Sequence, residues 1–248
     1  MIINSIILFL SAMIGGLYAL KVTKTKESQV KSILVFAGSF LFSITIVHIL
    51  PELFETHKDQ FYIGIFILIG FFFQQILEYF TSGVEHGHMH VHKHGNEHSA
   101  WSGFSLMVAL CIHAFLEGTI LAHPDVIHGA HSQGTLLTGV VLHKIPAALA
   151  LMTVLSCHYN QKKRQMILLL IFALASPFGV LAGHWLEPAG LISEEGMVML
   201  FAFVAGNFLH ISTTIFIESS PEHQWNSKKL IISLLGAGLA ILSESFFS

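Results

Sequence analysis

Residues 101–122 read WSGFSLMVALCIHAFLEGTILA, an apolar run of 22 residues that is interrupted by His113 and Glu117. An α-helix of about 20 residues crosses the roughly 30 Å hydrocarbon core of a bilayer. Ionisable side chains at the centre of such a helix cost about 2.5 kcal/mol or more, and they usually mark an ion or substrate path. This stretch therefore predicts a membrane-spanning helix that carries a functional site.

Seven other stretches of the chain have the same length and apolar character. The expected spans are Ile2–Leu20, Ile33–Leu50, Phe61–Phe80, Trp101–Ala122, Gly134–Ser156, Met166–His184, Gly196–Ile217 and Leu230–Phe247. The sequence thus predicts an all-α polytopic membrane protein with eight transmembrane helices.

The composition supports this fold class. Of the 248 residues, 53% are hydrophobic and 11% are charged, whereas about a quarter of the residues of a soluble domain are charged. Buried helices of a soluble protein are excluded because almost no polar helix remains to cover them. The formal net charge of -3 argues against a nucleic-acid partner, and a surface with so few charges needs a lipid bilayer around it.

Basic residues set the expected orientation, because cytoplasmic loops are enriched in lysine and arginine. The loops on one side of the eight spans contain Lys21, Lys24, Lys26, Lys31, Lys93, Lys162, Lys163, Arg164, Lys228 and Lys229. The loops on the other side contain only Lys58. This asymmetry predicts that both termini lie outside, in the plasma membrane or a bacterial inner membrane.

Two similar helix ends suggest an internal repeat. The second span ends at His48-Ile49-Leu50-Pro51-Glu52, and the seventh ends at Glu218-Ser219-Ser220-Pro221-Glu222. Because these spans run in opposite directions, the similarity predicts an inverted 3+2+3 bundle. The repeats would be residues 1–80 and 166–248, separated by a loop at 81–100 and two central helices at 101–156. The alternative is a chance recurrence of helix-end residues.

Three metal-ligand side chains fall at the same depth. His113 and Glu117 are four residues apart and share one helix face, and His143 lies near the middle of the next span. Imidazole nitrogen and carboxylate oxygen suit Zn²⁺, with Fe²⁺ and Mn²⁺ as alternatives. The competing interpretation for each histidine alone is a hydrogen bond between helices.

These residues resemble the ZIP (Zrt-, Irt-like) family of divalent metal transporters. His113, Glu117 and Gly118 match its His-x-x-x-Glu-Gly core in helix four, and His143 and Pro146 match its helix-five motif. The resemblance covers the whole chain and implies an eight-helix inverted-repeat bundle that admits metal, most simply Zn²⁺, into the cytoplasm. Fe²⁺, Mn²⁺ and Cd²⁺ are alternative substrates, and no obligatory cofactor is implied.

The sequence departs from the family pattern in helices four and five. Where many members have further ligands, this chain has Ala114, Lys144 and Ala147. Lys144 lies too deep to reach water in a closed bundle, and Glu117 is its nearest carboxylate partner by depth. We therefore expect one metal at the core, with Lys144 in place of a second cation. The alternative is a lysine that faces a wet cavity.

Other candidate residues lie along the expected path. His48 and Glu218 are expected at its outer and inner ends, and His210 is either an intermediate ligand or a packing group. Glu78 and Glu244 are expected only at the membrane interface. A cytoplasmic loop contributes His86, His88, His90, His92, His94 and His98, which would capture metal loosely or form an idle linker.

Two other function classes compete with transport. An intramembrane zinc metalloenzyme would use Glu117 as a base, but the chain has no His-Glu-x-x-His motif. A haem protein would use membrane histidines as axial ligands. A transporter that is not an enzyme accounts for more of the observations, and the sequence leaves a homodimer open.

Overall fold

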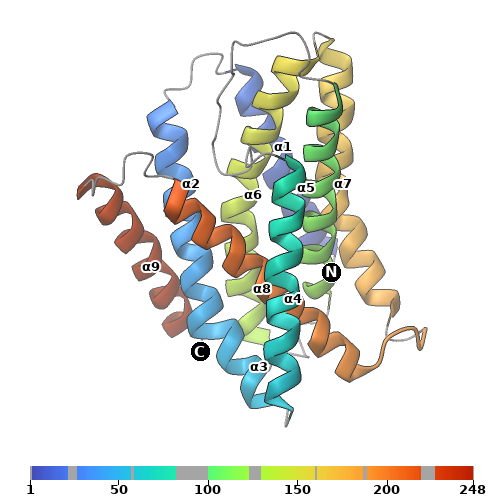
Figure 1. The fold of residues 1–248 in the computed structure, drawn as a ribbon, viewed down its shortest axis with the longest axis vertical. Coiled ribbons are helices and arrows are strands. Elements are labelled where there is room, and N and C mark those ends of the chain that lie inside the picture. The colour runs from blue at the N-terminus through green and yellow to red at the C-terminus, as the bar shows by residue number, and fades with distance from the viewer. Residues whose placement is uncertain are drawn as a thin grey trace.

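The computed structural model is a bundle of long helices (Figure 1), and it describes residues 2–21, 27–56, 59–81, 100–122, 130–159, 161–186, 189–218 and 227–247. The helices are α1 (Ile2–Lys21), α2 (Glu27–Ile44), η1 (Thr45–Ile49), α3 (Leu50–Thr56), α4 (Gln60–Thr81), α5 (Ala100–Ile120), α6 (Ala130–His158), α7 (Lys162–Leu186), α8 (Glu194–Glu218) and α9 (Ser227–Phe247). The described residues contain no strand, so the all-α expectation is confirmed for them.

Six of the expected spans are long and apolar enough to cross a bilayer. They are Ile2–Leu20, Ser32–Glu55, Gln60–Tyr79, Leu136–Thr153, Lys162–Leu186 and Glu195–Ile215. In α5 the apolar part within the described residues, Met107–Ile120, is shorter. The chain is therefore an integral membrane protein with at least these six candidate spans, and all eight expected stretches are helical.

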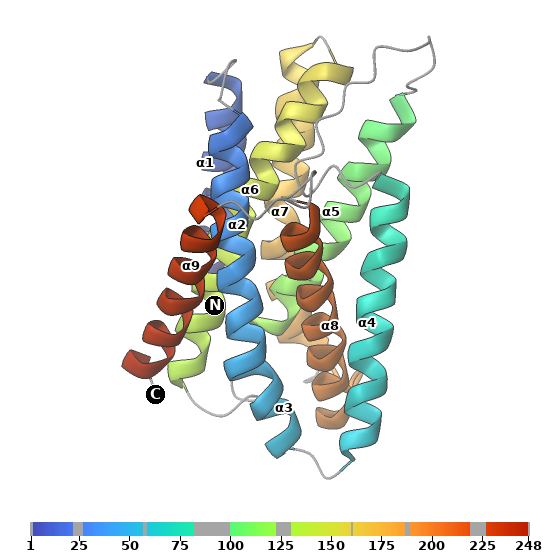
Figure 2. The same ribbon diagram turned by 60° about the vertical axis from the view of Figure 1, so that its left-hand side comes forward.

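The helices pack in two groups, and the members of each group are not consecutive in the chain. In one set α5 packs on α7 and α1 packs on both α6 and α7. In the other, α4 packs on α8 and α2 packs on both α9 and α8. Figure 2 shows α4 and α9 on opposite flanks of the bundle. The short helix α3 lies at one end of the bundle (the α3 end), where α9 also finishes.

Glycine allows the closest helix contact near the centre of the bundle. A methyl group at Gly118 of α5 would overlap the carbonyl oxygen of Ser176 in α7, and one at Gly179 would overlap the carbonyl oxygen of Phe115. The hydroxyl of Ser176 also donates a 2.8 Å hydrogen bond to the carbonyl oxygen of Ala114. Small residues let helix backbones approach in this way in membranes. The contact fixes the part of α5 that carries His113 and Glu117.

The helix that begins with α2 contains one π-helical turn, η1, before Pro51. Proline cannot donate a hydrogen bond to the preceding turn, and π-turns are often found at functional sites. His48 lies in this turn and is buried. His48 is therefore a buried side chain in the π-helical turn that precedes Pro51.

Candidate metal centre

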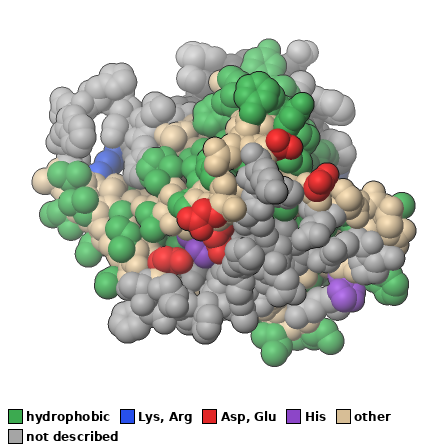
Figure 3. Space-filling model, turned by 90° about the horizontal axis from the view of Figure 1, so that it is seen from below, with side chains coloured by type: hydrophobic (Ala, Val, Ile, Leu, Met, Phe, Trp, Pro, Cys, Tyr) green, Lys and Arg blue, Asp and Glu red, His purple; other side chains and the backbone are tan. Residues whose placement is uncertain are grey.

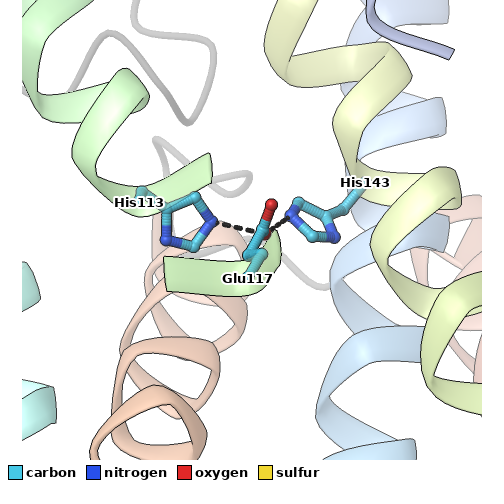
Figure 4. Close-up of side chains that lie close together, drawn as sticks. All are labelled: His113, Glu117 and His143. Carbon is cyan, nitrogen blue, oxygen red and sulfur yellow. Dashed lines mark ion pairs between the residues drawn. The ribbon is translucent and has the colours of Figure 1, made fainter. Parts of the chain in front are cut away.

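Three ligand side chains from two helices meet inside the bundle, as Figure 4 shows. His113 Nε2 lies 2.7 Å from Glu117 Oε1, and His143 Nε2 contacts the same oxygen. One potential ligand atom from each residue lies within 4.8 Å of the other two. All three side chains are buried, with Glu117 at 0% exposure. The structure therefore brings together the set that the sequence suggested.

The second carboxylate oxygen of Glu117 has a different partner. Lys144 Nζ donates a 2.8 Å hydrogen bond to Glu117 Oε2, and both groups are buried. The same ammonium lies 5.5 Å from the centre of the Phe172 ring, close enough for a cation–π contact. Lys144 therefore supplies a fixed positive charge on the side of Glu117 that faces away from the two imidazoles.

A backbone hydrogen bond orients the ring of His143. Its Nδ1 lies 3.0 Å from the carbonyl oxygen of Gly139, and that oxygen can only accept a hydrogen bond. A proton on Nδ1 donates to that oxygen, and the bond orients the ring so that Nε2 faces Glu117 Oε1. Metal-binding histidines are commonly oriented by such a second hydrogen bond.

Three polar atoms of the site are not satisfied by hydrogen bonds of ordinary geometry. Among the described residues, His113 Nδ1, His113 Nε2 and Glu117 Oε1 have no such partner. Buried polar groups are normally hydrogen-bonded, and exceptions call for an explanation such as an ion. Two imidazole nitrogens and one carboxylate oxygen fit a divalent cation, so the donors present suit a metal substrate.

Apolar side chains enclose the site. The fully buried Phe208 of α8 lies with its ring centre 6.4 Å from that of His113 and 6.1 Å from that of His143. Toward the α3 end, Phe40 and Ile44 of α2 pack against Gly139, one helical turn from His143. These contacts close the site on that side.

A small cavity of about 30 Å³ adjoins the two imidazoles on the other side. Its lining consists of Leu34, Ala37, Leu110, His113, His143, Ala147, Ile211 and Ile215. Leu110 precedes His113 on α5, which runs toward the α3 end, and Ala147 follows His143 on α6, which runs away from it. The cavity therefore lies on the side of the site that faces away from the α3 end.

A second histidine cluster lies at the α3 end. His48 Nε2 is 3.3 Å from Glu52 Oε2, and His48 Nδ1 is 2.8 Å from Glu244 Oε1 of α9. Figure 3 looks onto this end and shows carboxylates gathered beside a histidine. The sequence predicts His48 at an end of its span and Glu244 only at the membrane interface. Glu244 instead reaches a buried imidazole that is 196 positions earlier in the chain.

A third histidine joins two helices near the opposite end. His210 Nε2 of α8 contacts Glu78 Oε2 of α4, and the centres of the His210 and Phe71 rings are 4.8 Å apart. His210 therefore belongs to the α4–α8 interface and not to the central site. Glu78, like Glu244, has a histidine partner that spacing along the sequence could not reveal.

Two sets of candidates lie wholly or partly outside the described part of the chain. Glu218 is the last residue of α8, which puts it at the helix end remote from the α3 end, and its side chain is outside the described part of the chain. The loop histidines His86, His88, His90, His92, His94 and His98 also lie outside the described residues.

Comparison with known proteins identifies the family. The family model described as "ZIP Zinc transporter" matches residues 1–244. "Zinc transporter ZIP1" of Plasmodium falciparum is 26% identical over 84% of this chain and 76% of its own length. "Zinc transporter ZIP9-A" of Xenopus laevis is 28% identical over 61% of this chain, and the match spans half of the relative's length. "Protein zntD" of Dictyostelium discoideum is 25% identical over 65% of this chain and 25% of its own length. With a match over nearly all its length, this chain belongs to the ZIP zinc transporter family.

Proposed function

We propose that this protein carries a divalent metal ion, Zn²⁺ in the first instance, across the membrane into the cytoplasm through His113, Glu117 and His143. The observation that carries the proposal is the convergence of these three buried donors from α5 and α6. His113 Nδ1, His113 Nε2 and Glu117 Oε1 lack ordinary hydrogen bonds, and similar proteins are named zinc transporters. Buried ionisable groups in a membrane protein most often mark an ion path.

Lys144 gives the empty site a defined charge state. When no metal is present, its ammonium neutralises the Glu117 carboxylate through Oε2. A buried carboxylate without a partner would be strongly destabilising. An arriving cation would bind Oε1 and the two imidazoles while Lys144 remains on Oε2. The site then holds one metal, and the lysine replaces a second.

The charge distribution supports entry from the α3 end, which carries the outer loops in the orientation predicted from the lysines. His48, Glu52 and Glu244 form a polar cluster there and would receive metal first. Phe40 and Ile44 pack against Gly139 between this cluster and the central site. In the predicted orientation the small cavity would lie on the cytoplasmic side. This arrangement suits release inward, with Glu218 at the inner end of the path.

The packing pattern supports the inverted repeat. If α1, α2 and α4 correspond to α7, α8 and α9, and α5 to α6, each main contact has an equivalent. The α5–α7 pair corresponds to α6–α1, and the α4–α8 pair corresponds to α9–α2. Such pairing is expected when two repeats of opposite orientation form one bundle.

Two carboxylates occupy equivalent places in this repeat. Gly70 of α4 abuts the Phe203 carbonyl oxygen of α8, and Gly236 of α9 abuts the Phe36 carbonyl oxygen of α2. Glu78 and Glu244 each follow the glycine of their own helix by eight residues. Each carboxylate contacts a histidine of the partner helix, His210 or His48. The two His–Glu pairs thus lie at opposite ends of the bundle. Rocking of the repeats would expose the central site to each side in turn.

The structure gives the metalloenzyme alternative little support. A general base needs a free carboxylate oxygen near a metal-bound water. In Glu117 one oxygen faces both imidazoles and the other accepts from Lys144, so neither is left for proton transfer.

The direct test of the proposed function is uptake by proteoliposomes that contain the purified protein. Zn²⁺, Fe²⁺, Mn²⁺ and Cd²⁺ would be offered singly and in competition, with liposomes without protein as the control. Saturable, protein-dependent Zn²⁺ uptake is expected. Uptake equal to that of empty liposomes for every metal would contradict the proposal.

A further inference from the structure

The two ring nitrogens of His48 have different surroundings. Nδ1 lies 2.8 Å from Glu244 Oε1 of α9, which is within hydrogen-bond distance. Nε2 lies 3.3 Å from Glu52 Oε2, yet this nitrogen is buried and makes no hydrogen bond of ordinary geometry. The histidine as a whole is only 7% exposed. A buried polar nitrogen in this condition calls for a ligand that the protein itself does not provide.

This arrangement is the one that proteins use to hold a metal-binding histidine. Such a histidine binds the metal through one ring nitrogen and donates its other N–H to a carboxylate, which fixes the orientation of the ring. Glu244 can accept from Nδ1 of His48 in this way. The lone pair of the neutral ring then lies on Nε2, which faces Glu52. Imidazole nitrogen and carboxylate oxygen are both ligands of Zn²⁺.

The local sequence places both donors on one helix face, whereas the supporting carboxylate comes from elsewhere. His48 lies in the π-helical turn η1, and Glu52 follows it by four residues in α3. Residues at this spacing are neighbours on a helix surface. Glu244 lies on α9, near the other end of the chain. The donor pair is therefore local, and its orientation depends on how α9 packs.

Water can reach this donor pair. The side chains of Glu52 and Glu244 are 18% and 24% exposed, respectively. Figure 3 shows carboxylates and a histidine together at the surface of the α3 end. A metal bound by two protein donors would complete its coordination with water, since Zn²⁺ takes four ligands. It would be held less tightly than at the central site, which offers three donors.

We infer that His48 Nε2 and Glu52 form a second, weaker site for a divalent cation at the α3 end, and that Glu244 positions His48 for this site without binding the metal. The inference rests on the proposed function for the kind of ligand. It assigns to α9 a role in metal capture, because the carboxylate that holds the imidazole belongs to that helix.

Calorimetric titration with Zn²⁺ tests whether the site exists. The parent protein would be the full-length chain in detergent with its six loop histidines replaced by serine and with Glu117→Gln, which keeps the size of that side chain but removes its charge. Adding His48→Gln should abolish one weak equivalent of Zn²⁺ binding. Identical titrations of the two proteins would overturn the inference. Because the central site is disabled in both, that result would leave the proposed transport path untouched.

Three further variants of the same parent test the role of Glu244. Glu244→Ala should weaken Zn²⁺ binding by roughly 10- to 100-fold, the usual effect of losing such a supporting group. Glu244→Gln should restore much of the affinity, because its amide oxygen still accepts from Nδ1 of His48. Glu55→Gln removes the same charge from an exposed position of α3 and should leave the affinity near that of the parent. Equal losses in Glu244→Ala and Glu244→Gln would overturn the positioning role, because the carboxylate charge itself would then be required.

Discussion

Glu117 has two carboxylate oxygens with different partners, and this difference defines the chemistry of the site. Oε1 faces His113 and His143, while Oε2 accepts from Lys144. A metal that binds at Oε1 adds positive charge close to an ammonium that is already present. The lysine should therefore weaken metal binding enough to permit release, and it should prevent a second metal from binding.

Metal stoichiometry tests this role of Lys144. The full-length chain with its six loop histidines replaced by serine should bind one tight equivalent of Zn²⁺ at the core. Lys144→Asp should raise this value toward two, or tighten binding and slow release, because it replaces a cation with a ligand. The measurement is bound zinc per chain after dialysis. Two tightly bound ions with Lys144 intact would be inconsistent with the account.

The pH of the medium should affect zinc uptake through His113 and His143. A protonated imidazole nitrogen has no lone pair for a metal, so protons and Zn²⁺ compete for His113 and His143. Initial Zn²⁺ uptake should decline as the external pH falls from 7.5 to about 5.5. A flat profile would contradict histidine ligation.

At the scale of helices, the contact between α5 and α7 holds the site together. Gly118 directly follows Glu117 in the sequence and abuts the Ser176 backbone, so a side chain there would push the two helices apart. Overpacking of this kind costs about 1–3 kcal/mol, and here it would also displace a ligand.

A matched pair of glycine variants tests that contact. Gly118→Ala should lower the thermal midpoint of the detergent-solubilised protein and reduce zinc uptake. Gly64→Ala on α4 should change neither, because the added methyl group would have no atom of another described helix within 4 Å. The midpoints would be read from fluorescence-detected size exclusion after heating. Equal midpoints for the two variants would show that close packing at Gly118 is unimportant.

The sequence predicts some of these features well and others not at all. The length of each apolar stretch predicts the membrane spans, because a helix needs about 20 apolar residues to cross a bilayer. Depth along adjacent helices brought His113, Glu117, His143 and Lys144 together. The partners of Glu78 and Glu244 could not be predicted in this way, because each lies on a helix distant in sequence and helical periodicity does not specify which helices pack together.

The sequence also does not predict which helices pack against each other. Order along the chain suggests two outer repeats around two central helices, whereas α5 and α6 pack chiefly on α7 and α1, one helix from each proposed repeat. The closest contacts depend on glycines whose facing partner is backbone, such as Gly118 and Gly70. Glycine in a membrane helix signals a close approach, but the sequence does not identify its partner.

At the scale of the whole molecule, transport and metal capture should be separable. The loop histidines lie between α4 and α5 and outside the predicted spans. Deletion of residues 86–98 should therefore leave saturable zinc uptake in place, with at most a change in the concentration that gives half-maximal uptake. Proteoliposome assays of the deleted and full-length proteins would show this. Complete loss of uptake would mean that the loop is part of the transport mechanism.

The central claim is that metal crosses the membrane through the buried donors of α5 and α6. Its most direct test is zinc uptake into metal-free proteoliposomes by Glu117→Ala, beside the exposed control Glu195→Gln, with equal amounts of folded protein in each membrane. We predict that Glu117→Ala loses saturable uptake because the one oxygen that both imidazoles face is gone, and that Glu195→Gln retains it. Saturable uptake at the wild-type rate in Glu117→Ala would contradict the claim.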